Sequence, residues 1–180
     1  AILASLAFHS RVSAADVHRE GISEVTAADV RSARDMDSVV KLLAIAQRQE
    51  NGLSLRVRPA FISQEHPLAW VCGPFNAVSV YGHANGHTMY YGRGAGGLPT
   101  ASAVAADLAS VAMGNAKRQF DQLRIWPDLN EPARQLPIDE ITSRYYIRIL
   151  AVDRPGVFAY IATILGKMGI SISSVLQREA

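Results

Sequence analysis

Four glycines fall within six residues in the stretch Gly92-Arg93-Gly94-Ala95-Gly96-Gly97. A strand-like run at 88–91 precedes them, and a helix signal led by Pro99 follows. Glycine permits positive φ and a close approach of backbone N–H groups to a ligand. A helix start adds unpaired N–H groups and a partial positive charge. The pattern therefore predicts contact with the phosphate of a nucleotide or with another anion.

The spacing of Gly92, Gly94 and Gly97 matches G-x-G-x-x-G, the fingerprint of dinucleotide-binding Rossmann folds. That fingerprint also needs a second parallel strand ending in an acidic residue about 20 residues later. Here that distance falls at 116–118, in a polar stretch. The context argues against an independent Rossmann site. A glycine turn that merely joins a strand to a helix remains the alternative.

A second possible binding turn lies at Asp153-Arg154-Pro155-Gly156-Val157. Proline sets φ for a helix start, and Gly156 would let a small ligand reach backbone N–H groups. An α-carboxylate would suit such a site. An ordinary turn between a strand and a helix, with a surface ion pair, explains the same residues equally well.

Other catalytic patterns are absent from the sequence. The five histidines share no metal-ligand spacing, so no metal site is predicted, and no serine lies in G-x-S-x-G. Cys72 has no basic neighbour, which favours a small buried thiol over a nucleophile. Lys41 lies in an apolar run, and we expect its role to be structural.

Composition narrows the class of protein. Apolar residues make up 49% and charged residues 19%, which is typical of a globular protein. The net charge of +2 comes without a polybasic stripe, which argues against nucleic acid, and no apolar run nears the ~20 residues that span a membrane. The single cysteine rules out an internal disulfide framework and fits a reducing cytoplasm.

The first part of the chain predicts two successive hairpins. Asn51-Gly52 and Asn85-Gly86 are strong turn signals between strand-like runs. Leu53 begins an alternation of apolar and polar residues that predicts a half-buried strand ending, or lying at an edge, at Pro59. Thr26 begins a helix with an approximate capping box. The expected fold class is α+β, an open α/β sandwich whose mixed, mostly antiparallel sheet carries helices on one face. The predicted strands span 39–47, 52–58, 75–82 and 87–91, and the predicted helices span 1–9, 26–36 and 99–112. Periodicity at 39–47 suits a buried strand or a helix, and pairing with 52–58 behind the tight turn favours the strand.

The last part predicts a second unit. A strand is expected at 145–152, a helix with one apolar face after Gly156, and another strand from Ile170. Such a β-α-β unit of roughly 40 residues is too small to bury its own core, so it needs further sequence or a partner. The expected boundaries are 1–113, a linker at 114–143, and 144–180.

Several of these blocks occur in the order found in one enzyme family. The chain resembles homoserine dehydrogenase over nearly its whole length, most specifically at 91–104. The tail at 145–179 is similar to the first half of an ACT domain, a ferredoxin-like βαβ segment. The shorter matching blocks are Glu20-Gly21-Ile22, 40–46, His66-Pro67-Leu68-Ala69 and Asn76-Ala77-Val78.

The resemblance implies a reaction and its cofactor. It implies reversible NAD- or NADP-dependent reduction of L-aspartate 4-semialdehyde to L-homoserine, in threonine, methionine and isoleucine biosynthesis, by a homodimer built on the central sheet. It places a dinucleotide contact at Gly96, with Gly92 and Gly94 as neighbours. It also suggests a threonine effector at Gly156 and Gln177.

The resemblance also implies a loss. The family's Rossmann domain and catalytic lysine would precede Ala1, so we expect no catalytic residue within this chain and no dehydrogenase activity from it alone. The alternative is a non-catalytic, ACT-type amino-acid-sensing and dimerisation module. A free-standing nucleotide-binding protein is disfavoured by the missing acidic partner of the glycines.

Overall fold

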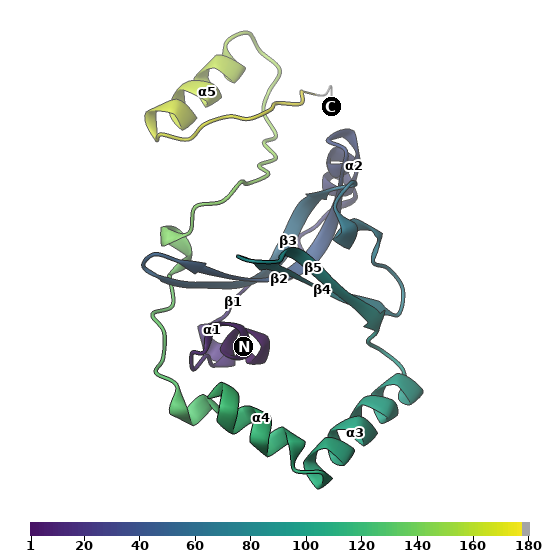
Figure 1. The fold of residues 1–180 in the computed structure, drawn as a ribbon. Coiled ribbons are helices and arrows are strands. Elements are labelled where there is room, and N and C mark those ends of the chain that lie inside the picture. Colours follow the sequence, from purple (N-terminus) through teal and green to yellow (C-terminus); the bar gives the residue numbers. More distant parts are fainter. Residues whose placement is uncertain (178–180) are drawn as a thin grey trace. The chain divides into compact units, whose positions relative to one another are not determined.

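The structure is a computed structural model that describes residues 1–177, apart from the side chain of Pro127, and it divides into two units. The first unit is Ala1–Arg144, and the second begins at Tyr145 (Figure 1). The first unit contains helices α1 (Ile2–Phe8), α2 (Ala27–Asp35), α3 (Gly97–Ala112) and α4 (Asn115–Leu123), and strands β1 (His18–Arg19), β2 (Ser38–Gln49), β3 (Gly52–Ser63), β4 (Phe75–Gly82) and β5 (Gly86–Arg93).

The first predicted hairpin is confirmed as β2 and β3, which pair from Gln49↔Gly52 to Ser38↔Ser63. Strand β1 adds to the other side of β3 in parallel, so the sheet order is β1-β3-β2. Strand β3 continues through Pro59 instead of ending there. By the alternation of the ladder from the turn, Pro59 directs its nitrogen away from β2, beyond the two residues that β1 covers. The edge position therefore accommodates a residue without an N–H group.

The predicted half-buried character of β3 is wrong at residues 53–56, which are all buried. Leu53 and Leu55 join a small apolar core with Ala4 and Val12 from the N-terminal segment. On the alternate positions, the Arg56 guanidinium donates to Ser54 Oγ and to Gln47 Oε1. The Ser54 hydroxyl and the Gln47 amide thus supply acceptors for the buried guanidinium.

Two helix predictions for the N-terminal region have different outcomes. Helix α1 forms, but Ile2 is 78% exposed and only Ala4 and Ser5 of this helix are buried, so the expected buried helix is buried on one side. The capping box that starts α2 is confirmed, because Asp29 N–H donates to Thr26 Oγ1 and Thr26 N–H donates to Asp29 Oδ2.

The second predicted hairpin is confirmed as β4 and β5, paired from Phe75↔Arg93 to Gly82↔Gly86. Its turn spans 83–85, and Gly86 takes the left-handed conformation at φ 66°. The two hairpins form separate sheets, and residues 64–74, which include the short 3₁₀ turn Pro67–Trp70, connect β3 to β4. The Lys41 ammonium, for which a structural role was expected, donates to the Val71 carbonyl at 2.6 Å and so links β2 to the loop before β4.

Residues 114–143, expected as a linker, contain helix α4 and a segment hydrogen-bonded to β3. Leu53 N–H donates to the Arg134 carbonyl and Leu136 N–H donates to the Leu53 carbonyl, both at 2.8 Å. A Cβ atom on Gly52 would collide with the Arg134 oxygen, so glycine permits this close approach. Leu136 and Ile141 are buried. This segment is therefore part of the first unit.

The second unit contains helix α5 (Val157–Lys167). Gly156 precedes the helix at φ 89°, and Gly169 follows it at φ 71° while Ile170 N–H donates to the Leu165 carbonyl. The helix and its glycine cap were predicted and are confirmed. The expected strands at 145–152 and from Ile170 are not formed in the described part of this unit. A strand needs the backbone groups of a neighbouring strand, and hydrophobic alternation alone does not supply them.

Candidate functional site

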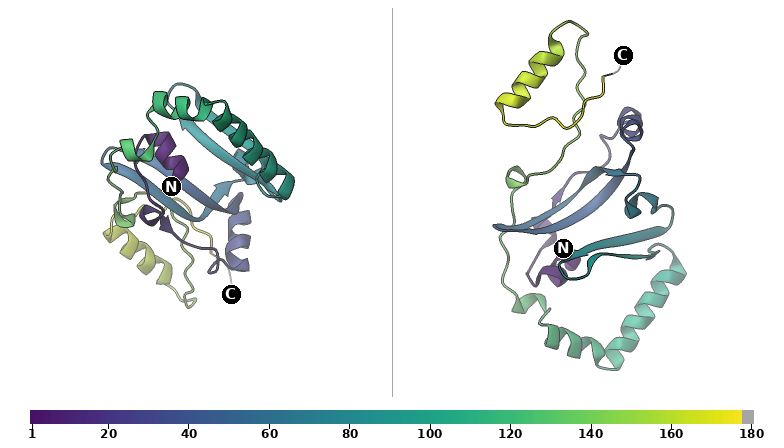
Figure 2. Two further views of the ribbon diagram at one scale, coloured as in Figure 1. Left: turned by 90° about the horizontal axis from the view of Figure 1, so that it is seen from below. Right: turned by 45° about the horizontal axis from the view of Figure 1, so that its top comes forward.

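The glycine block, residues 92–97, joins strand β5 to helix α3 as predicted. Strand β5 ends at Arg93, and α3 begins at Gly97 with Gly96 as its N-cap. The Gly96 carbonyl accepts hydrogen bonds from Thr100 N–H at 3.1 Å and Thr100 Oγ1 at 2.8 Å. These two hydrogen bonds hold the turn against the first helical residues. Figure 2 shows α3 following the end of β5, with α4 after it.

The turn presents unused backbone donors to solvent. Gly94 N–H donates to the Pro74 carbonyl at 3.2 Å, which ties down the start of the loop. Within residues 1–177, the N–H groups of the next four residues, 95–98, donate to no protein acceptor. All four residues are exposed, and α3 adds its positive dipole end at the same place. Such a cluster of donors can bind a phosphate or a carboxylate.

The positions of the glycine block differ in what a side chain there would meet. Gly96 has φ 122°, a conformation that other residues adopt with strain. Gly94 lacks room for a side chain, because the Asn76 amide occupies that space. Gly92 and Gly97 have neither constraint: φ is ordinary and a Cβ atom would meet nothing within 4 Å. Their missing side chains leave open space beside the free donors.

Arg93 brings a positive charge to the same turn. Its guanidinium lies 5.2 Å from the centre of the Phe75 ring, and Phe75 stacks on Tyr91 at 5.0 Å. No acidic side chain of the described chain forms an ion pair with Arg93. The aromatic pair therefore positions a cation that is free to attract an anion. Sequence analysis missed this residue, and its one signal was the arginine placed between two glycines.

The remaining predicted residues lie elsewhere. Gly156 is the exposed N-cap of α5, and Gln177 is an exposed residue at the end of the described chain, both in the second unit. Cys72 is exposed, so the expectation of a buried thiol is wrong. It lies in the loop after the 3₁₀ turn, where no core forms around it.

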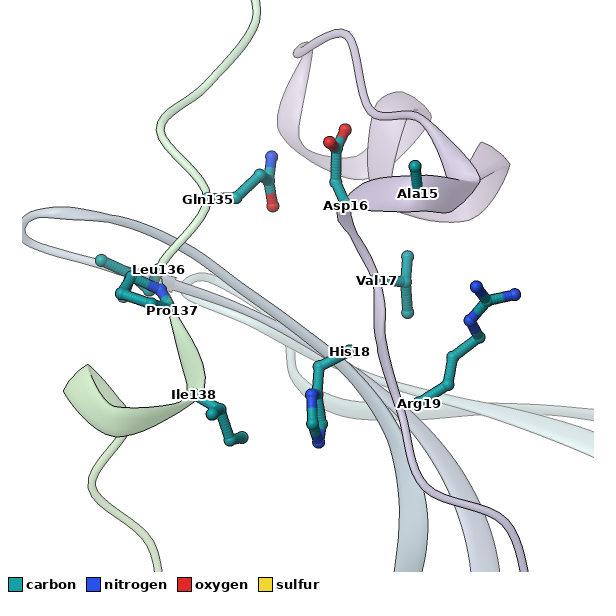
Figure 3. Close-up of a pocket in the computed structure, with 9 residues that line it drawn as sticks. All are labelled: Ala15, Asp16, Val17, His18, Arg19, Gln135, Leu136, Pro137 and Ile138. Carbon is teal, nitrogen blue, oxygen red and sulfur yellow. The ribbon is translucent and has the colours of Figure 1, made fainter.

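An open groove of about 480 Å³ lies in the first unit between residues 15–19 and 135–138 (Figure 3). It includes none of the predicted site residues, and one oxygen of the Asp16 carboxylate already accepts from Ser13 N–H at 2.7 Å. In the part of the chain that the structure covers, no cluster of histidine, cysteine or acidic side chains could hold a metal ion. No described helix has both the length and the hydropathy that crossing a membrane requires.

The chain is an α+β protein in which a strand, a glycine turn with unused N–H donors and a helix N-terminus follow one another. The model of the homoserine dehydrogenase family matches residues 1–109, and the ACT domain model matches 145–180. The chain belongs to the homoserine dehydrogenase family. This finding confirms the resemblance and the fold class drawn from the sequence.

Individual relatives agree with this assignment. Homoserine dehydrogenase of Pseudomonas aeruginosa is 44% identical and matches 99% of this chain, and that of Mycobacterium tuberculosis (strain H37Rv) is 43% identical over 98%. The crystal structure of a homoserine dehydrogenase from Thiobacillus denitrificans superposes with a TM-score of 0.82 at 38% identity and covers 98% of this chain. The chain spans 41–42% of the length of these three proteins.

Proposed function

We propose that this chain is part of an NAD- or NADP-dependent homoserine dehydrogenase, which interconverts L-aspartate 4-semialdehyde and L-homoserine. Family membership and the free donors of the glycine block support the proposal together. When bound, the reduced dinucleotide would supply the hydride that reduces the aldehyde carbon, and a proton would complete the alcohol. The reaction belongs to the synthesis of threonine, methionine and isoleucine, in the cytoplasm.

In this proposal the glycine block binds one end of the dinucleotide. The N–H groups of Gly96 and Gly97 donate to a phosphate oxygen, and Arg93 contributes its charge. The open space at Gly92 lets the ligand approach the backbone. The observation that carries this assignment is the set of exposed donors, at residues 95–98, that no protein acceptor uses.

The 180-residue chain alone would lack turnover. Hydride transfer needs a group that gives the carbonyl oxygen a proton or takes one from it, and a lysine is suited to that step. The chain has three lysines, and Lys41 and Lys117 are engaged by the Val71 carbonyl and the Asp121 carboxylate. Lys167 lies in the last turn of α5, in the second unit. We therefore assign no catalytic residue within this chain.

The second unit would bind an amino-acid effector. The match to an ACT domain and the left-handed turn at Gly156 favour this role, with threonine as the effector and Gln177 as a further contact. Residues 144–180 would form the regulatory part and residues 1–113 the catalytic and dimerisation part, in a homodimer. A non-catalytic sensing module is the second candidate function, because it requires only this unit.

Two assays test the proposal. Homoserine oxidation is followed at 340 nm with NADP⁺ and with NAD⁺, for the 180-residue chain and for the product of its complete reading frame. We expect no turnover by the 180-residue chain. We expect turnover by the product of the complete reading frame where that product is longer than the chain. Turnover by the chain would refute its proposed inactivity. Saturable threonine binding without turnover or nucleotide binding by either protein would favour the sensing module.

A further inference from the structure

Asn76 lies beside the glycine block, although it is far from it in sequence. It occupies the second position of β4, directly opposite Gly92 in the ladder. Its amide also fills the space where a side chain at Gly94 would lie. The strand pairing with Gly92 and the position of the amide beside Gly94 are two separate observations that place Asn76 next to the glycine block.

The carboxamide of Asn76 is available for a ligand. The side chain is exposed and makes no hydrogen bond to any residue from 1 to 177. Asn85, in the turn of the same hairpin, differs because its amide donates to Thr88 Oγ1 at 3.2 Å. Asn76 therefore lies beside Gly94 with both its amide donor and its amide acceptor unused.

The space in front of this carboxamide is open as well. Residues opposite each other in an antiparallel ladder direct their side chains to the same face. Asn76 and Gly92 share such a face, and a Cβ atom on Gly92 would meet nothing within 4 Å. A ligand seated on the glycine block would therefore have room beside Asn76.

We propose that Asn76 binds the dinucleotide directly, through a group on the ligand that both donates and accepts hydrogen bonds. Phosphate oxygens are acceptors, and the backbone donors with Arg93 already suit them. A carboxamide offers one acceptor oxygen and two N–H donors, which complement a ribose hydroxyl or the nicotinamide carboxamide. The inference rests on the proposed function and adds a contact to the part of the cofactor that is not phosphate.

Nitrogen-15 NMR of the 180-residue chain can test the contact, with NADP⁺ and inorganic pyrophosphate as separate probes. Side-chain NH₂ signals of asparagines are resolved from backbone signals, so Asn76 and the glycines are read in one titration. We expect NADP⁺ to shift the Asn76 NH₂ pair together with the Gly96 and Gly97 amides. Pyrophosphate should shift the two glycine amides and leave the Asn76 pair in place.

Affinity measurements on Asn76→Ala, with Asn85→Ala as the matched control, separate binding from support of the loop. Loss of one neutral hydrogen bond should weaken NADP⁺ binding about fivefold. Pyrophosphate binding by Asn76→Ala and both affinities of Asn85→Ala should stay unchanged. An equal loss for both probes in Asn76→Ala would overturn the proposal, because it would mean that Asn76 only supports the loop.

Two further outcomes are distinguishable. If NADP⁺ shifts the glycine amides but not the Asn76 pair, the direct contact is refuted while the proposed function stands. If NADP⁺ shifts neither set, the cofactor role of the glycine block fails together with the contact. An Asn76 shift with pyrophosphate alone would also overturn the proposal, since it would assign the contact to phosphate.

Discussion

The β2–β3 hairpin has four consecutive buried residues, 53–56, whereas the β4–β5 hairpin has none. Both are antiparallel pairs closed by short turns. The first is covered by α1, by β1 and by the segment around Leu136. The second leaves Val78, Val80 and Tyr90 exposed along one face. The two hairpins therefore differ in their surroundings more than in their construction.

The difference in burial suggests different roles, with the first hairpin contributing to stability and the second to ligand binding. The first hairpin contributes Leu53 and Leu55 to the small apolar core of its unit, and the second carries the glycine block at its end. Residues that make few internal contacts can be selected for a ligand or a partner surface instead. We expect substitutions in the first hairpin to lower the free energy of unfolding. Substitutions at the end of the second hairpin should lower the affinity for the dinucleotide.

The largest expected effect is that of Leu53→Ala. Leu53 is 2% exposed, and its truncation removes buried apolar surface and leaves a cavity. Such changes cost about 2–5 kcal/mol in unfolding free energy, which urea denaturation followed by circular dichroism would measure. Val78→Ala is the matched control in the second hairpin, and its cost should stay below about 1 kcal/mol because Val78 is 42% exposed. Equal losses would contradict the comparison.

The next largest effect is expected at the glycine block. Gly96→Ala strains the backbone, because alanine rarely adopts φ 122°, and should cost about 1–2 kcal/mol in unfolding free energy. Gly97→Ala has an ordinary φ and open space, so its stability should be unchanged. Both variants should bind NADP⁺ about tenfold more weakly, since a methyl group would stand where the ligand approaches. Isothermal titration and urea denaturation would separate the two effects. Normal NADP⁺ binding by Gly97→Ala would show that its open space is not used by a ligand.

A smaller effect is expected at the cap of α2, which packs on β2. Thr26→Ala removes the oxygen that accepts the hydrogen bond from Asp29 N–H. The substitution should lower the free energy of unfolding by about 1 kcal/mol, measured by thermal unfolding. Ser13→Ala removes a similar cap from a three-residue 3₁₀ turn and should cost less. A larger loss for Ser13→Ala would indicate that the N-terminal segment, and not α2, supports the first hairpin.

The smallest effect is expected at Asp121, outside both hairpins. Hydrogen bonds from Lys117 and then Trp126 lower the pKa of this carboxyl below its usual 3.8. A lowered pKa in the folded chain means that its stabilising effect is present above pH 3.8 and is lost as the pH falls through the lower folded-state value. Trp126 fluorescence in a Trp70→Phe background should change only in that acid range. In Asp121→Asn that acid transition should disappear, and a transition that persists would exclude Asp121 as its origin.

Local signals allowed much of the first unit to be predicted. The capping box of Thr26 and Asp29 lies within four residues, and each hairpin turn lies between two strand patterns. These features depend on neighbouring residues, so a sequence pattern contains their whole cause. The glycine block was predicted for the same reason, because strand, turn and helix start are contiguous there.

Features that depend on distant residues were not predicted. Burial of Arg56 depends on Gln47 across the hairpin, and the position of Leu136 depends on Leu53. Strand alternation at 145–152 predicted a strand that needs a neighbour to form. Within the candidate site, Asn76 became recognisable from the register of β4 and β5, and Arg93 from its position over the Phe75 ring. The cofactor and effector roles remain predictions.

The hydrogen bonds that join Leu53 to Arg134 and Leu136 determine where this polypeptide can be shortened. A protein ending at 113 would lose the segment that pairs with Leu53 and would uncover the core beneath it. A protein ending at Arg144 would retain that segment together with Leu136 and Ile141. Limited proteolysis should accordingly give a stable fragment that includes residues 131–141. The second unit can then be removed for separate biophysical work without damaging the part that carries the glycine block.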